Sequence, residues 1–286
     1  MKHVFQVRIG PVGFRVGSDW RTPVEQLAAL YRDYPQPESG VADFSVRLFA
    51  ARPWRRVIRP SITLGGDYAL PDAAPLPLAQ GLLAAEMAMN LQMALGQRRY
   101  LLLHAATVER DGRALLMTGE SGAGKSTLAA LLAARGWRFM GDEFALVDPA
   151  TGLVHAFPRL VSVKNAAIDV VRTAYPDARW GPLLAGTPKG AIRHLVPPPA
   201  ALAAMDRPAK PALILFPRFG PARDRRPVPP SEVFVRLTQA STNYVALGEA
   251  GFDALTRLVQ AAPAQAIDYP DTDSAVAEVE ALWAAL

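Results

Sequence analysis

The 286-residue sequence predicts an α/β protein with two domains, a small α+β domain over residues 1–95 and a larger α/β domain over residues 96–286. Three observations support this prediction. Short strand-like and helical patterns are mixed in the first part, and a long helical pattern over 75–95 is placed to bridge the two domains. Beyond it, apolar strand and helix patterns alternate around a glycine-rich loop. Hydrophobic residues make up 50% of the chain and charged residues 20%, which is typical of a globular protein with a sizeable core.

Turn signals and periodicity define the elements of the first domain. Gly10-Pro11 and the segment 35–40 are turn-forming, and Gly65-Gly66 ends an extended stretch. The expected elements are strands over 5–9, 13–16 and 43–50, a helix over 23–34, and the extended stretch over 56–64.

The larger domain is expected to open with a hairpin. Tyr100–Glu109 and Arg113–Thr118 are strand-like, and Asp111-Gly112 between them forms a tight turn. A helix over 126–135 ends at Gly136. The other expected elements are strands over 137–140 and 213–216, an exposed loop over 218–230, and helices over 251–260 and 273–285.

Composition excludes several classes of function. No cysteine is present, so we expect no disulfide, no thiolate metal site and no cysteine nucleophile. The N-terminus lacks the pattern of a secretory signal, and polar residues interrupt the longest apolar stretch, 76–95, so we expect a cytoplasmic protein without a membrane partner. The net charge is +5, but only five basic residues are lysines and no nucleic-acid motif is present, so we expect no nucleic-acid partner.

A glycine-rich segment between an apolar strand and an apolar helix matches the eight-position phosphate-binding loop, the Walker A or P-loop motif. Its glycines let backbone N–H groups approach phosphate, and the helix N-terminus adds partial positive charge. We expect Lys125 to contact the β- and γ-phosphate oxygens and the Ser126 hydroxyl to bind Mg²⁺. The predicted nucleotide-binding residues are Gly119, Glu120, Ser121, Gly122, Ala123, Gly124, Lys125, Ser126 and Thr127.

An acidic pair follows the next predicted strand. Asp142 lies 17 residues after Lys125, so the chain returns directly from the loop helix to the phosphates. Ligands of open α/β sheets bind at the carboxyl ends of strands. We expect Asp142 to accept a proton from an attacking hydroxyl and Glu143 to help hold the metal. The alternative is that these are solvent-exposed acidic residues in a turn after the strand, without a functional role.

His104 lies 15 residues before Gly119. In isolation, a histidine in an apolar strand is explained as a hydrogen-bonded core residue. The order of His104, the loop 119–126, Arg135-Gly136-Trp137-Arg138 and Gly141-Asp142-Glu143 resembles the catalytic domain of HPr kinase/phosphorylase, a bacterial enzyme that phosphorylates a serine of HPr. The resemblance implies a fold of the HPr kinase/PEP carboxykinase type.

The same resemblance implies functional roles. Asp142 takes the place of the family's catalytic carboxylate, Glu143 that of its second aspartate, and His104 that of the histidine near the transferred phosphate. It also implies a homo-oligomer. Where the HPr enzymes carry Glu-Ile-Arg-Gly, this chain has Ser162-Val163-Lys164-Asn165.

A larger part of the chain resembles the HprK-related kinase A group. The segments are Asp142 to Leu146, Ser162 to Asn165, Thr187 to Gly190, Phe216 to Arg218, and residues between Asn243 and Phe252. Related kinases act on peptides, so the resemblance implies a peptide hydroxyl as acceptor. The candidate contacts to the γ-phosphate or the acceptor, with solvated surface charge as the alternative, are Lys164, Lys189, Arg193 and Arg218.

The favoured hypothesis is therefore a Mg²⁺-dependent phosphotransferase that moves the γ-phosphoryl group of ATP or GTP to a hydroxyl, expected to be serine, of a peptide or protein. Two alternatives stay open. The same site chemistry suits a kinase for a small hydroxylated metabolite, and the chain is also compatible with a non-catalytic nucleotide-binding module whose first domain grips a partner.

Overall fold

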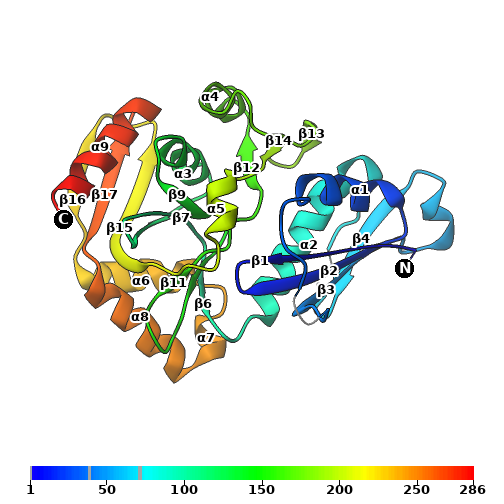
Figure 1. The fold of residues 1–286 in the computed structure, drawn as a ribbon, viewed down its shortest axis with the longest axis horizontal. Coiled ribbons are helices and arrows are strands. Elements are labelled where there is room, and N and C mark those ends of the chain that lie inside the picture. The colour runs from blue at the N-terminus through cyan, green and yellow to red at the C-terminus, as the bar shows by residue number, and fades with distance from the viewer. Residues whose placement is uncertain (1, 38–39, 70–72) are drawn as a thin grey trace. The chain divides into compact units, whose positions relative to one another are not determined.

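The computed structural model describes residues 2–37, 40–69 and 73–286. The chain forms two compact units (Figure 1): Met1–Gln97 with Arg179–Val196, and Arg98–Ala178 with Pro197–Leu286. The sequence placed the whole of 96–286 in one domain, whereas the segment Arg179–Val196 belongs to the first unit.

The first unit is built on a five-stranded sheet with strand order β1-β2-β3-β4-β5. Strands β2 and β3 run parallel, and the other neighbouring pairs are antiparallel. Helices α1 and α2 pack against it and against each other. The elements are β1 (His3–Ile9), β2 (Val12–Ser18), α1 (Arg21–Leu30), β3 (Phe44–Phe49), the short 3-10 helix η1 (Pro53–Arg56), β4 (Ser61–Gly66), β5 (Leu76–Pro77), η2 (Leu78–Gln80), α2 (Gly81–Gly96), β13 (Leu184–Thr187) and β14 (Gly190–Leu195).

The core of this unit follows the two-residue period of its strands. Val46 and Leu48 of β3 are fully buried, whereas Arg47 between them is exposed. A buried hydrogen bond of 2.9 Å from the Tyr31 hydroxyl to the Glu86 carboxylate joins the end of α1 to α2. The burial of Glu86 is thereby compensated by a polar partner.

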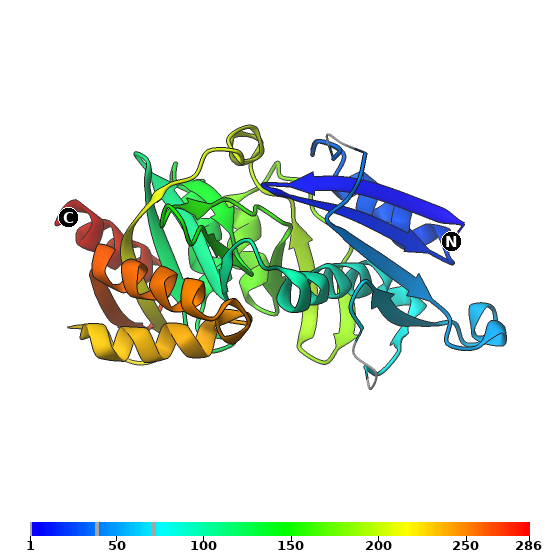
Figure 2. The ribbon, with the colours of Figure 1, turned by 90° about the horizontal axis from the view of Figure 1, so that it is seen from below.

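The second unit contains a six-stranded sheet with strand order β16-β17-β15-β8-β7-β9. In Figure 2, α6 (yellow) and α8 (orange) lie along one side of its green strands. The elements are β6 (Leu101–Leu103), β7 (Ala105–Arg110), β8 (Arg113–Thr118), α3 (Lys125–Ala134), β9 (Arg138–Gly141), β10 (Ala145–Val147), β11 (Val154–His155), β12 (Val161–Lys164), α4 (Ala167–Ala174), α5 (Pro199–Ala203), β15 (Lys210–Phe219), β16 (Asp224–Pro227), α6 (Pro230–Ala240), α7 (Tyr244–Leu247), α8 (Glu249–Ala261), β17 (Ala264–Tyr269) and α9 (Thr272–Ala284).

Helices cover both faces of this sheet. Ala114 and Leu116 of β8 share one apolar core with Leu237 of α6 and Leu255 of α8. The intervening residue Leu115 points to the other face, where α3 packs on β7 and β9, and α9 packs on β17. The sheet is therefore the middle of three layers, as expected for an α/β fold.

Two sequence expectations are corrected. The strand expected over Tyr100–Glu109 is broken at His104, because β6 pairs with β10 while β7 pairs with β8. The loop expected over 218–230 contains β16, which pairs with β17. In the sheet, β7 lies between β8, which precedes the glycine-rich loop, and β9, which precedes the acidic pair. Among the described residues, no helix is long and apolar enough to span a membrane.

Candidate active site

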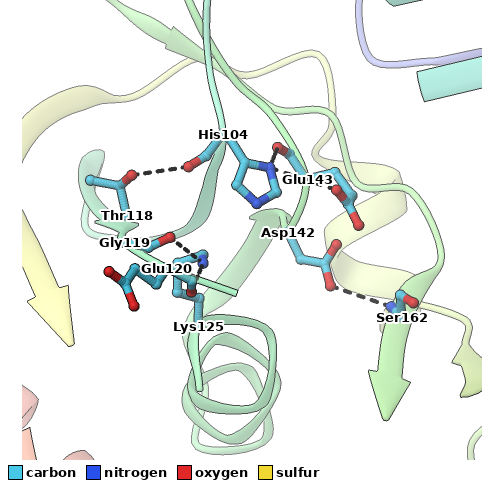
Figure 3. Close-up of polar contacts among 8 residues, drawn as sticks. All are labelled: His104, Thr118, Gly119, Glu120, Lys125, Asp142, Glu143 and Ser162. Atoms are coloured by element: carbon cyan, nitrogen blue, oxygen red, sulfur yellow. Dashed lines mark hydrogen bonds and ion pairs between the residues drawn. The ribbon is translucent and has the colours of Figure 1, made fainter. Parts of the chain in front are cut away.

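Strand directions bring the candidate residues to one edge of the sheet. β8 is antiparallel to β7, and β7 is antiparallel to β9, so β8 and β9 run in the same direction. The phosphate loop (residues 119–126) after β8 and the acidic pair after β9 therefore leave the same edge. His104, which precedes β7, lies at this edge too. Figure 3 shows His104, Lys125 and the two acidic residues around one space.

The phosphate loop has the backbone conformation that its glycines permit. Gly119, Gly122 and Gly124 have φ angles of 149°, 89° and 87°. A side chain is strained at such angles. Gly124 immediately precedes α3, so the backbone N–H groups of the first helical turn point towards the loop. Anions bind at helix N-termini that have this arrangement.

Lys125 lies across its own loop. Its side chain is buried, and Nζ donates hydrogen bonds to the backbone oxygens of Gly119 and Glu120 at 2.7 and 2.8 Å. These bonds hold the ammonium group inside the curve of the loop (Figure 3). The cation is therefore positioned where phosphate oxygens would approach the loop.

Asp142 is a buried carboxylate with two hydrogen-bond donors. Its exposed fraction is 5%, its Oδ2 accepts from the Ser162 backbone N–H at 3.3 Å, and the Ser126 hydroxyl donates to it. Burial and the charge of Glu143 raise the pKa of Asp142 to about 7, against the opposing effects of these hydrogen bonds and of Lys164. Such a pKa suits a group that exchanges protons near neutral pH.

His104 is tied to the residue next to Asp142. Its Nδ1 lies 3.1 Å from the backbone oxygen of Glu143 and 3.7 Å from Oε2 of the same residue. Because a carbonyl oxygen only accepts, this contact places the hydrogen on Nδ1 and leaves the Nε2 lone pair available. Burial lowers the pKa of His104, and the charges of Lys125 and Lys164 act in the same direction.

An open cleft of about 820 Å³ adjoins the phosphate loop. It is lined by His104, residues 118–123 and residues at the ends of β15 and α6. Three arginines line it: Arg218, Arg226 and Arg236. The cleft is large enough for a drug-sized ligand, and its lining includes Glu120 and Asp268 besides the three arginines.

The four predicted cations are divided between the units. Lys164 at the end of β12 influences the pKa values of both His104 and Asp142, so it belongs to the site electrostatically. Arg218 lines the cleft and forms a two-pronged ion pair with Asp268. Lys189 and Arg193 are part of the first unit, on β14 and its hairpin turn, where Arg193 Nε donates to the Gly181 oxygen at 2.9 Å.

Sequence reasoning missed Tyr269, which braces the phosphate loop. Its hydroxyl donates to the Ala123 backbone oxygen at 2.8 Å. A Cβ added to Gly124 would lie 2.2 Å from this hydroxyl, so the tyrosine also fills the space beside the loop. Tyr269 lies at the end of β17, which runs parallel to β15. Prediction of this strand from the sequence would have pointed to the tyrosine, but β17 was not predicted.

The donor set is suited to Mg²⁺ bound together with a nucleotide. Among the described residues, no cluster of three or more histidine, aspartate or glutamate side chains is able to hold a metal by itself. Mg²⁺ usually takes one or two protein oxygens and completes its shell with water and phosphate oxygens. The Ser126 hydroxyl, whose hydrogen bond lowers the pKa of Asp142, would supply one such oxygen.

Comparisons with known proteins give a family-model match and matches to solved structures. A family model described as SynChlorMet cassette protein ScmC matches residues 81–171, which is less than half of the chain. No curated protein matches significantly. Among solved structures, the Hpr(Ser) kinase/phosphatase from Coxiella burnetii is similar, with a TM-score of 0.29 and 13% sequence identity, over 65% of this chain and 99% of that chain.

Proposed function

We propose that this protein is a kinase that transfers the γ-phosphoryl group of ATP to a hydroxyl of a peptide or protein. The observation that supports it most strongly is the convergence of the phosphate loop, Asp142 and His104 at one edge of the sheet. Phosphoryl transfer depends on positioning and charge neutralisation, and these residues provide both.

Each residue has a proposed role. The phosphate loop and Lys125 hold the β- and γ-phosphates, and Ser126 with Glu143 holds the metal. When bound, Mg²⁺ neutralises charge on the phosphate oxygens. Asp142 accepts the proton of the attacking hydroxyl, because its raised pKa makes the carboxylate a competent base at neutral pH.

His104 and Lys164 complete the proposed site. The Nε2 of neutral His104 accepts a hydrogen bond from the substrate hydroxyl or from water. Lys164 adds positive charge next to Asp142. The peptide or protein acceptor, with serine preferred, is inferred from the sequence resemblance to kinases that act on peptides. A small hydroxylated metabolite is the competing acceptor.

Incubation of the purified chain with γ-labelled ATP and Mg²⁺ tests the proposal, with a mixed peptide library in one arm and a metabolite extract in the other. We expect labelled peptide that yields phosphoserine on acid hydrolysis, and no label with Lys125→Ala. If only a metabolite is labelled, the acceptor is a small hydroxylated molecule and not a peptide or protein. Nucleotide binding without turnover in either arm would leave a non-catalytic module.

A further inference from the structure

A short, strongly basic loop projects from the first unit. Residues 52–59, here named the arginine–tryptophan loop, read Arg-Pro-Trp-Arg-Arg-Val-Ile-Arg, with four arginines and no acidic residue. Three of its apolar side chains are exposed: Trp54 by 53%, Val57 by 81% and Ile58 by 64%. Exposed apolar side chains interleaved with arginine are typical of binding surfaces.

The loop is held in a defined conformation. The Trp20 indole N–H donates to the Arg56 backbone oxygen at 3.0 Å, and Arg56 lies 3.6 Å from Asp19. Arg55 donates to the Arg59 backbone oxygen at 3.2 Å. These contacts attach the loop to the end of β2, so its side chains are presented by a fixed backbone.

The other arginines of the loop are available to a partner. Within the described part of the chain, Arg52, Arg55 and Arg59 have no acidic side chain within ion-pair distance. Arg52 stacks over the Trp54 ring, 5.3 Å from its centroid. A planar guanidinium fixed on an aromatic ring is well placed for a bidentate bond to a carboxylate.

The basic surface continues from the loop onto the neighbouring sheet. Arg47 and Phe49 of β3 point away from the core, opposite to Val46 and Leu48. Arg15 of β2 is exposed too, and it pairs in register with Ser45 of β3. Side chains in register on parallel strands share a face. Exposed arginines and apolar side chains therefore occur both on the loop and on this face of the sheet.

The charge of the whole chain is concentrated in the same unit. The first unit has 13 lysines and arginines against 8 aspartates and glutamates, a net charge of +5, whereas the second unit has 18 of each. The unit that contains the phosphate loop is therefore neutral, and the net positive charge is carried by the other unit. Such asymmetry favours an acidic partner for the first unit.

We propose that the arginine–tryptophan loop and the adjoining sheet face dock an acidic, extended peptide segment of the phosphoryl acceptor. The inference rests on the proposed function, because it assigns the docking part of the substrate. Carboxylates of the segment pair with Arg52, Arg55 and Arg59, while apolar residues between them cover Trp54 and Val57. Because exposed arginines lie on the strands β2 and β3 as well as on the loop, an extended acidic chain is a better fit than a membrane surface, which would engage the loop alone.

Direct binding without nucleotide tests this proposal. The full chain is titrated into a fluorescein-labelled peptide of alternating glutamate and leucine, and into the same peptide with lysine in place of glutamate, and polarisation is recorded. We expect binding of the glutamate peptide only, weakened as NaCl rises. Arg52→Glu with Arg59→Glu should weaken it by about tenfold or more.

Arg32→Glu with Arg135→Glu is the matched control. It changes the net charge by the same amount, and both arginines are exposed. Arg32 lies 3.7 Å from Asp33 and Arg135 lies 3.5 Å from Asp273, so each forms only a weak surface ion pair. We expect it to alter binding by less than about threefold. Circular dichroism spectra and thermal unfolding should be the same for both double variants and the unmodified chain.

Three binding results would overturn the docking proposal. These are equal weakening by both double variants, equal binding of the two peptides, and sedimentation with phosphatidylserine vesicles that depends on Arg52 and Arg59 while the glutamate peptide stays unbound. Failure of the proposed kinase activity can be distinguished from failure of docking. Loop-dependent peptide binding without phosphorylation contradicts the proposed function alone, and phosphorylation unaffected by the loop variants contradicts docking alone.

Discussion

The proposed chemistry depends on one buried carboxylate that is costly to ionise. Asp142 is almost completely enclosed, and its nearest like charge is the next residue, Glu143. The hydrogen bonds from Ser126 and Ser162 compensate only part of this cost, because the pKa remains about 7. Destabilised groups of this kind are concentrated at functional sites.

Replacing Asp142 by Asn should therefore change how stability depends on pH. Between the ordinary pKa of 3.8 and about 7, the folded state keeps a proton that the unfolded state has lost, so rising pH favours unfolding. We expect the unmodified chain to lose on the order of 3 kcal/mol relative to Asp142→Asn between pH 4 and 8. Urea unfolding in EDTA, without nucleotide, measures this difference.

The sign of that difference is the critical result. Glu143→Gln is the companion variant, and it should reduce the pH effect by removing the neighbouring negative charge. If the unmodified chain instead gains stability over Asp142→Asn as pH rises, the carboxylate is stabilised as an ion and the proposed base role loses its physical basis.

At the scale of elements, the phosphate loop depends on a strand distant in sequence. Tyr269 at the end of β17 binds Ala123 and occupies the space beside Gly124. The loop conformation is thus determined jointly by its own glycines and by the parallel pairing of β17 with β15.

A double-mutant cycle should reveal this coupling. Gly124→Ala places a side chain at a φ of 87° and 2.2 Å from the Tyr269 hydroxyl, so we expect a loss of at least about 2 kcal/mol in unfolding free energy. Tyr269→Phe alone should cost about 1 kcal/mol. In the double variant the nearest ring atom is 3.4 Å away, so the combined loss should be smaller than the sum.

Strict additivity in urea unfolding would show that the tyrosine does not support the loop. Gly112→Ala is the control for the cost of placing a side chain at a positive φ. Gly112 has a φ of 74°, but an added Cβ would have no atom within 4 Å.

The elements that sequence predicted best are those specified by local patterns. The glycine turn conformation at 119–124, the following helix and the Asp111-Gly112 hairpin all depend on nearby residues, and the structure contains each of them. Strand order was not predictable in the same way. The insertion of β7 between β8 and β9, and the pairing of β16 with β17, arise from long-range packing that no local pattern encodes.

At the scale of the whole molecule, the two units divide charge as well as structure. The unit with the phosphate loop is neutral, while the other carries the net charge of +5. The sequence division at 95/96 could not foresee that Arg179–Val196 belongs to the first unit, because contacts of a segment that returns to an earlier domain are nonlocal.

Nucleotide binding should raise the unfolding free energy of the unit that binds the nucleotide. A ligand at one hundred times its dissociation constant adds about 2.7 kcal/mol to the unfolding free energy of the part it binds. We expect Mg·ATP to raise the unfolding temperature of the unmodified chain in calorimetry. Lys125→Ala should show no such rise, because it removes the buried ammonium group held at Gly119 and Glu120. An equal rise in both proteins would place the nucleotide elsewhere.

The most direct test of the central claim separates binding from transfer in Asp142→Asn. Calorimetric titration gives the affinity for Mg·ATP, and release of labelled phosphate, to water or to an accepted peptide, gives turnover. If the carboxylate, the phosphate loop and the Lys125 ammonium form one transfer site, affinity should stay within a few-fold while kcat falls by about 10² or more. An unchanged kcat would contradict the account.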